Sequence, residues 1–110
     1  MKIHDVVGNL IGAGEFILGA DATGSHACYL IYGVLKPGEK GRLLKPGAGH
    51  EEIVLAMNGD ILLHGESMFV LGKGQAIHLQ GEESLRAENA GNTDIIYVIA
   101  GGHGGGGHAH

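Results

Sequence analysis

Short apolar segments, each bounded by turn-forming residues, follow one another along almost the whole chain. Few stretches show the i, i+3, i+4, i+7 spacing of an amphipathic helix, whereas apolar runs separated by Gly, Pro, Asn and Asp are typical of strands. The pattern predicts strands over residues 2–7, 15–18, 26–35, 41–45, 50–57, 61–64, 67–71, 75–80, 84–89 and 94–100. The chain is therefore predicted to be all-β, and short strands at this spacing indicate a sandwich or barrel.

The connections between these segments supply the backbone conformations that reversing strands need. Residues 36–38 (Lys-Pro-Gly) and 58–60 (Asn-Gly-Asp) are turns of this kind, because Pro fixes φ and Gly accepts positive φ. Residues 27–32 (Ala-Cys-Tyr-Leu-Ile-Tyr) are so apolar that the run is either buried on both faces or covered on its outer face by another subunit, and an oligomer is the simpler explanation. We expect a second subunit to cover that side, which predicts a homodimer.

Length, composition and charge narrow the class of protein. At 110 residues there is room for one hydrophobic core, so one domain is expected. No apolar run approaches the roughly 20 residues that cross a bilayer, and the net charge of −5 leaves no excess of Lys and Arg for phosphates. We therefore expect neither a membrane nor a nucleic-acid partner. The first five residues do not resemble a secretion signal, which favours a cytoplasmic location, and the single cysteine, Cys28, is expected to be a buried thiol.

Two segments in the second half of the chain have the spacing of paired family motifs. Six residues separate Glu52 from Gly59, and Gly74 and Asn89 lie one full motif length apart. In this the chain resembles the cupins, whose first motif ends in Glu, six residues and Gly, and whose second motif runs from Gly through Pro-x-Gly and His to Asn. The resemblance covers about residues 35–100. It implies a double-stranded β-helix, a jelly-roll barrel of two antiparallel sheets with a ligand cavity at its mouth.

Most of the metal ligands of that family are missing from this chain. No register places the first motif's His-x-His between positions 44 and 48, and Leu85 stands at the histidine position of the second motif. A divalent transition metal needs three or four N, O or S donors, so the family's metal-dependent oxygenase and isomerase activities do not carry over. The cavity does carry over, and it predicts a small-molecule ligand. The candidate ligand-binding residues are His50, Glu52, Leu85 and Asn89.

A rearranged metal site is the alternative. His50 and Glu52 lie two positions apart, so on a strand they share one face. The candidate third ligands are His26, His64 and His78. His78 would face away from the barrel if Ile77 and Leu79 face the core. A divalent Ni, Zn, Fe or Mn ion held there would favour a metal-dependent isomerase, lyase or dioxygenase; without one, His50 and Glu52 would form a hydrogen-bonded pair or bind a polar ligand.

The last ten residues contain six glycines and three histidines. We expect the folded domain to end near Ala100 and residues 101–110 to form a flexible tail. The imidazoles of His103, His108 and His110 can coordinate Ni, Cu or Zn, which suggests metal capture or delivery. A neutral Gly/His appendage is the competing interpretation. The sequence thus supports three hypotheses of function: a small-ligand-binding barrel, a metal-dependent enzyme with rearranged ligands, and a metal-handling protein.

Overall fold

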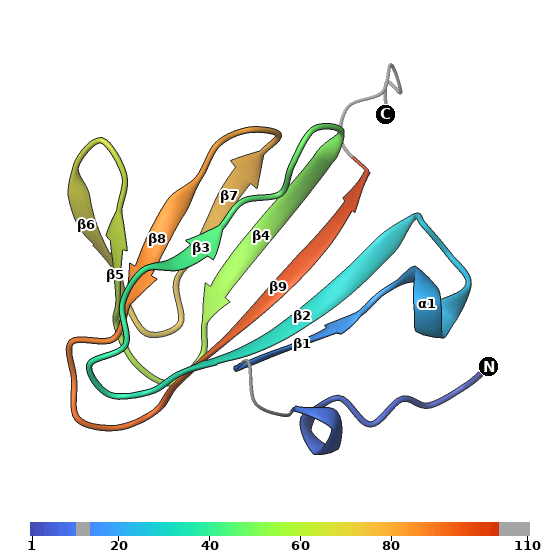
Figure 1. Cartoon of the computed structure of the whole chain (residues 1–110), viewed down its shortest axis with the longest axis horizontal. Coiled ribbons are helices and arrows are strands. Elements are labelled where there is room, and N and C mark those ends of the chain that lie inside the picture. Colours follow the sequence, from blue (N-terminus) through green and yellow to red (C-terminus); the bar gives the residue numbers. More distant parts are fainter. Residues whose placement is uncertain (11–13, 104–110) are drawn as a thin grey trace.

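The structure, a computed structural model, describes residues 1–10 and 14–103 (Figure 1). Its elements in chain order are η1 (Val7–Asn9), β1 (Glu15–Leu18), α1 (Ala20–Thr23), β2 (Cys28–Leu35), β3 (Arg42–Leu44), β4 (His50–Ala56), β5 (Ile61–His64), β6 (Met68–Leu71), β7 (Ala76–Gln80), β8 (Leu85–Glu88) and β9 (Ile95–His103). The strands form two antiparallel sheets, one in the order β1-β2-β9-β4-β7 and one in the order β3-β8-β5-β6. The prediction of an all-β chain with two antiparallel sheets is confirmed.

The hydrophobic core lies between the two sheets. Successive side chains of a strand point to opposite faces, and in β4 and β9 the buried positions alternate with more exposed ones. The buried apolar residues are Leu35, Leu44, Val54, Ala56, Ile61, Leu63, Leu71, Leu79, Ala87, Ile95, Tyr97 and Ile99. We call the face that carries these residues the inner face, and the opposite one the outer face.

The N-terminal segment differs from its prediction. Residues 2–7 were predicted to form a strand, and this is wrong: within residues 1–10 the structure has one turn of 3-10 helix, η1, and no strand. The amide of Gly8 donates a hydrogen bond to Asp5 Oδ1 at 2.9 Å. Asp side chains compete with strand pairing through local bonds of this kind, which the apolar pattern alone did not reveal.

The connection from β1 to β2 is longer than a hairpin turn, because it contains the short helix α1. The helix ends at Gly24, whose φ of 76° is left-handed, and the hydroxyl of Thr23 donates to the carbonyl of Gly19 at 3.1 Å. Neither feature was predicted. The helix stands at the end of the sheet where β2 begins and β9 ends (Figure 1).

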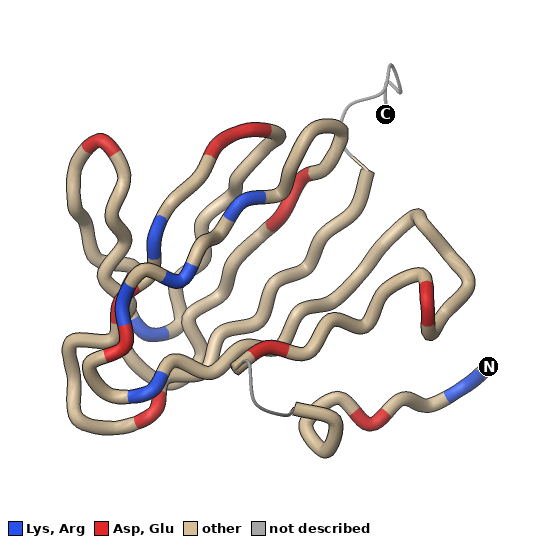
Figure 2. The backbone as a smooth tube through the Cα atoms, in the orientation of Figure 1, with Lys and Arg blue, Asp and Glu red and all other residues tan. Residues whose placement is uncertain are grey.

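Most charged side chains lie outside the strands (Figure 2). The strands of each sheet carry three: Glu15, Glu51 and Glu52 in the five-stranded sheet, and Arg42, Arg86 and Glu88 in the four-stranded sheet. Strands β2 and β9 carry no Lys, Arg, Asp or Glu. Of the helices within residues 1–10 and 14–103, none has the length and apolar character needed to cross a bilayer.

Candidate ligand-binding site

A tyrosine and a glutamate meet across the central strand of the five-stranded sheet. Gly101 of β9 pairs with Tyr29 of β2 on one side and with Glu52 of β4 on the other. A Cβ atom at Gly101 would lie 2.3 Å from the Tyr29 ring, so this position accepts only glycine while the ring lies across it. The phenol reaches over β9 and donates a hydrogen bond to Glu52 Oε2 at 2.7 Å. The sheet register therefore builds a Tyr29–Glu52 pair.

Both members of this pair are shielded from water. Glu52 is 5% exposed, and Tyr29 is partly buried. Burial raises the pKa of the Tyr29 phenol well above its usual range, and the hydrogen bond and the negative charge of Glu52 raise it further. The phenol consequently keeps its proton and directs it to the carboxylate, which leaves the phenol oxygen free to accept a hydrogen bond.

Two histidines lie beside the pair. His50, two residues before Glu52 on β4, pairs with His103 at the end of β9, and the two rings stack with centroids 5.0 Å apart and planes 28° apart. The Tyr29 and His50 rings meet edge to face at 5.9 Å. Nδ1 of His50 is buried and has no hydrogen-bond partner within the described part of the chain. A buried polar atom without a partner is uncommon and calls for an explanation.

These residues line a cavity of about 480 Å³. Its polar wall contains Tyr29, Glu52, His26, His50, His103 and Lys45. Its apolar wall contains Ile17, Ala20, Ile31 and Pro46. Lys45 stands in the β3–β4 loop, where its Nζ forms an ion pair with Glu82 at 2.8 Å. An open cavity of this volume, with a few polar groups among apolar ones, suits a small molecule.

The structure brings together three of the sequence candidates and adds one in an unexpected place. His26, His50 and Glu52 all line the cavity, as does His103. His103 was expected in a flexible tail beyond Ala100, but β9 continues through Gly101 and Gly102 to His103. Two consecutive glycines predict a strand poorly, so the strand predicted from the apolar pattern ended too early.

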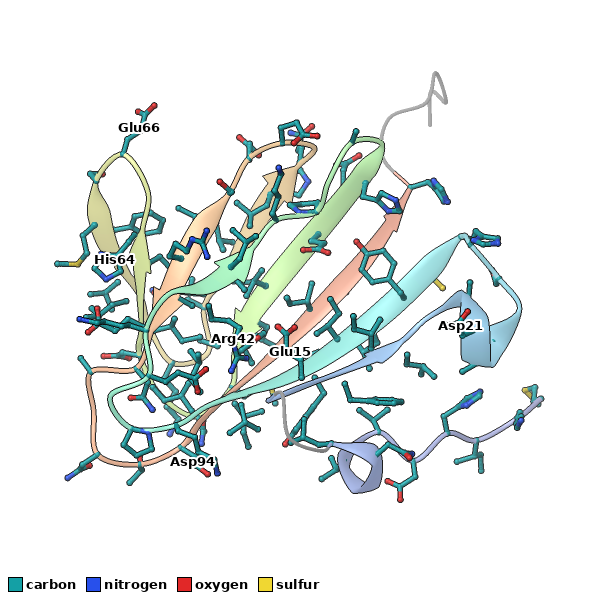
Figure 3. All side chains as sticks on the ribbon, viewed as in Figure 1. Glu15, Asp21, Arg42, His64, Glu66 and Asp94 are labelled. Atoms are coloured by element: carbon teal, nitrogen blue, oxygen red, sulfur yellow. The ribbon has the colours of Figure 1, made fainter. Side chains whose placement is uncertain are left out.

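The other two histidine candidates lie elsewhere. His64 is on the outer face of the four-stranded sheet, where its Nε2 lies 2.7 Å from Glu88 Oε1 (Figure 3). His78 faces outward from β7, and its Nε2 lies 2.8 Å from Glu51 Oε1. The outward direction of His78 agrees with the alternation expected from its buried neighbour Leu79.

Leu85 and Asn89, the two candidates from the second motif, also lie away from the cavity. Leu85 pairs with Leu44 across β3 and β8 and packs against the core. Asn89 is fully buried at the other end of β2, where its amide donates to the carbonyls of Leu35 at 2.9 Å and Thr93 at 2.7 Å. Its carbonyl oxygen accepts from the Gly91 amide, so this side chain holds a turn together.

Tyr29 was not among the candidate ligand-binding residues, and Cys28 differs from expectation. The phenol of Tyr29 reaches Glu52 only because Gly101 stands between them, a neighbourhood set by the pairing of three strands far apart in sequence. Cys28 was expected to be buried but is exposed at the start of β2, beside the cavity. The apolar run that contains Cys28 forms strand β2, and Cys28 is the first residue of that strand, at the end that borders the cavity.

Among residues 1–10 and 14–103, no three His, Cys, Asp or Glu side chains are placed to hold one metal ion. Leu44 and Leu85 fill the inner face near the motif positions, and Glu52 is already bonded to Tyr29. His108 and His110 lie outside the described residues, so metal binding by the tail stays a prediction.

Comparisons by sequence found no relative: no family model matches the chain, and neither does any curated protein. Comparison of structures found many. A cupin 2 conserved barrel domain protein from Salinispora arenicola superposes with a TM-score of 0.69 at 19% identity, over 91% of this chain and 87% of that one. A conserved protein with a double-stranded β-helix domain from Klebsiella pneumoniae also gives 0.69, at 15% identity, over 97% and 94% of the two chains.

A third similar structure is described as a predicted oxalate decarboxylase from Thermotoga maritima. It has a TM-score of 0.66 and 24% identity over 81% of this chain and 80% of that one. At such identities, fold is shared without any implication about substrate. The chain has the cupin fold, a double-stranded β-helix of two antiparallel sheets.

Proposed function

We propose that this protein binds a small organic ligand in the cavity beside Tyr29, His50 and Glu52. The observation that carries the proposal is the state of Glu52. The residue is 5% exposed and borders a cavity of about 480 Å³, and the Tyr29 hydroxyl is the one hydrogen-bond donor to its carboxylate within the described chain. Burying a carboxylate that accepts a single hydrogen bond is unfavourable unless a ligand supplies further hydrogen bonds or a positive charge.

The two walls of the cavity favour a ligand with two different ends. Glu52 and the unpartnered Nδ1 of His50 stand on the polar wall. On the apolar wall, Ile17 is 59% exposed although it lies on the inner face of the sheet, where it pairs with Ile31. An exposed isoleucine in a concave site is a surface that gains free energy when an apolar group covers it. The ligand therefore has a polar group for Glu52 and a carbon body for Ile17.

A fragment screen followed by nuclear magnetic resonance would test this function. Full-length, ¹⁵N-labelled protein is titrated with small amphipathic fragments, and we expect saturable shifts of the Tyr29, Glu52 and Gly101 amides. Fragment affinity should fall in Tyr29→Phe, which removes the hydroxyl. The matched control is Tyr32→Phe, because Tyr32 lies on the same strand but on the outer face.

Two results would contradict the proposal. One is the absence of any saturable shift with fragments at millimolar concentration. The other is a set of shifts centred away from the cavity, for instance around Asn89 and the turn that it holds.

A further inference from the structure

Two tyrosine–glutamate pairs of the same construction lie near the two ends of β9, and they differ in one component. In each, a ring crosses a glycine to reach a glutamate. Tyr97 donates to Glu15, and Arg42 completes this pair, with Nη1 2.9 Å from the Tyr97 hydroxyl and 3.9 Å from Glu15 Oε2 (Figure 3). Tyr29 donates to Glu52, but no ion pair with Glu52 forms within the described residues. The Tyr29–Glu52 pair therefore borders a cavity, whereas the Tyr97–Glu15 pair is completed by the Arg42 guanidinium.

The free hydrogen-bonding capacity at the second pair consists of acceptors. Glu52 is an acceptor at both oxygens, and one of them is taken by Tyr29. The Tyr29 hydroxyl uses its proton in the hydrogen bond to Glu52, and its oxygen can still accept a hydrogen bond, as the Tyr97 oxygen does from Arg42. Nδ1 of His50 also accepts when its ring carries the proton on Nε2. A group with several donors and no acceptor complements this set, and a primary ammonium ion is such a group.

The surroundings of the carboxylate favour a cation as well. The rings of Tyr29, His50 and His103 lie within one cluster beside Glu52, with neighbouring centroids 5.9 Å and 5.0 Å apart. Aromatic faces attract ammonium groups, most strongly in sites shielded from water. The charge-assisted hydrogen bond to a buried carboxylate is stronger than one between neutral groups.

We propose that the ligand of this cavity is a small primary amine, bound as its ammonium ion against Glu52 and Tyr29 with its carbon chain against Ile17 and Ile31. This rests on the proposed function, because it names the ligand class of the same cavity. The ammonium takes the place that the Arg42 guanidinium has at the other pair.

Among the described residues that line the cavity, Lys45 is the one Lys or Arg, and its charge would favour the opposite choice, an anionic ligand. Its Nζ forms an ion pair with Glu82 at 2.8 Å, and the side chain is 39% exposed. An exposed, paired lysine attracts an anion weakly. Glu52, in contrast, is buried deeper in the cavity and has no cation beside it in the described part of the chain. The buried negative charge of Glu52, and not the exposed positive charge of Lys45, therefore determines the class of ligand.

Three probes with the same carbon chain separate the classes: butylamine, butan-1-ol and butyrate, each titrated into full-length ¹⁵N-labelled protein. We expect butylamine to shift the Tyr29 and Gly101 amides with an affinity at least about tenfold above that of the other two. Glu52→Gln should remove this preference for the ammonium ion over the neutral alcohol. The matched control is Glu51→Gln, since Glu51 is the adjacent carboxylate on the outer face, where it pairs with His78.

The unmodified protein alone can overturn the inference, even if Glu52→Gln fails to fold. Butanol or butyrate binding in the cavity as tightly as butylamine would refute the amine and leave the proposed function standing. An equal loss of butylamine affinity in Glu51→Gln and Glu52→Gln would also refute it. If none of the three probes and no screening fragment bound in the cavity, both the amine and the proposed function would fall.

Discussion

Gly33 and Gly101 each allow a tyrosine ring to lie across the neighbouring strand. A Cβ atom at Gly33 would lie 2.1 Å from the Tyr97 ring, and one at Gly101 would lie 2.3 Å from the Tyr29 ring. Since neither distance is compatible with a real Cβ contact, the two glycines fix where the phenols can point. The positions of both Tyr–Glu pairs therefore depend on residues that have no side chain.

Replacing Gly101 by alanine should damage the site more than the fold. The added methyl group displaces the Tyr29 ring and breaks its hydrogen bond to Glu52, so we expect amine or fragment affinity to fall about tenfold or more and stability to fall by about 1–3 kcal/mol. Denaturant unfolding and the same titrations measure the two effects. Gly19→Ala is the matched control in the same cavity, because a Cβ there has contacts no closer than 3.6 Å. Equal losses in both variants would disprove the role of Gly101.

Removing the hydroxyl of Tyr97 should destabilise the protein. Tyr97 is fully buried, and its hydroxyl joins Arg42 to Glu15. Tyr97→Phe leaves these charged groups without a shared partner, at an expected cost of about 1–3 kcal/mol in the free energy of unfolding. Tyr32→Phe should change stability by less than about 0.5 kcal/mol. A Tyr97→Phe variant as stable as the parent in urea unfolding would show that the hydroxyl contributes nothing.

Glu39 should make stability depend on pH in the acid range. The hydrogen bond that the Lys36 amide donates to Glu39 lowers the pKa of this carboxyl group in the folded protein, and the Arg42 guanidinium lowers it further. Burial raises the pKa, but by less than these interactions lower it. A depressed folded pKa contributes stability that is fully present above the unfolded value, and this stability is lost as pH falls through the folded value. We therefore expect the difference in unfolding free energy between the parent and Glu39→Gln to shrink below about pH 4.5. A difference that stays constant from pH 7 to pH 3 would contradict this.

At the scale of elements, β9 is the strand that carries most of the site's architecture. It is hydrogen-bonded to β2 on one side and to β4 on the other, and its last residues place Gly101 under Tyr29 and His103 against His50. The site therefore needs β9 to continue beyond its apolar part.

Two truncations distinguish the contribution of β9 from that of residues 104–110. Ending the chain after His103 keeps all of β9, so we expect stability and ligand affinity to stay within about 0.5 kcal/mol of the parent values. Ending it after Ala100 removes the pairing partners of Tyr29 and Glu52, which should cost about 2–3 kcal/mol and abolish binding. Urea unfolding and amide exchange at Tyr29 measure the difference. Equal stability of the two truncated chains would mean that residues 101–103 do not act as strand.

The sequence predicted the strands well and the site incompletely, for a physical reason. Alternation of apolar residues and turn-forming glycines reports on local backbone, which is why β1 to β9 were all expected, most within a few residues. Motif spacing placed Glu52 in the barrel. The contact of Tyr29 with Glu52, and of His50 with His103, depends on how β2, β9 and β4 align side by side, and no local pattern encodes that register.

At the scale of the whole molecule, the outer face of the five-stranded sheet is apolar from β1 to β4. Its residues are Phe16, Leu18, Leu30, Tyr32, Val34, Ile53, Leu55, Ile96, Val98 and Ala100. Among the outward-facing strand residues of β1, β2, β9 and β4, Glu51 is the one charged side chain, and it lies near the start of β4, where it pairs with His78. A face whose centre carries no charge can meet its own copy across a two-fold axis without like-charge repulsion there. We expect a second copy of the chain to cover it.

A lysine in the middle of this face should separate the copies. Val98 pairs with Tyr32 and Leu55 at the centre of the sheet, so Val98→Lys leaves a solvated charge on a monomer but an unpaired buried one in a dimer. Light scattering after size exclusion should give a dimer for the parent protein and a monomer for this variant. Leu43→Lys is the control, because Leu43 is 46% exposed on the other sheet. A monomeric parent, or dissociation by Leu43→Lys, would contradict a dimer through this face.

The strand order has a consequence for how the molecule is made. β9 is the last of these strands to be synthesised, yet it lies in the middle of its sheet, between β2 and β4. While the ribosome is still translating residues 95–103, β1 and β2 on one side and β4 and β7 on the other have no strand to join them. The halves of this sheet can close only once β9 has emerged, so the pairing of residues far apart in sequence comes late, and slow folding is characteristic of such contacts. Until then the nascent chain exposes open strand edges, which are templates for pairing with other chains.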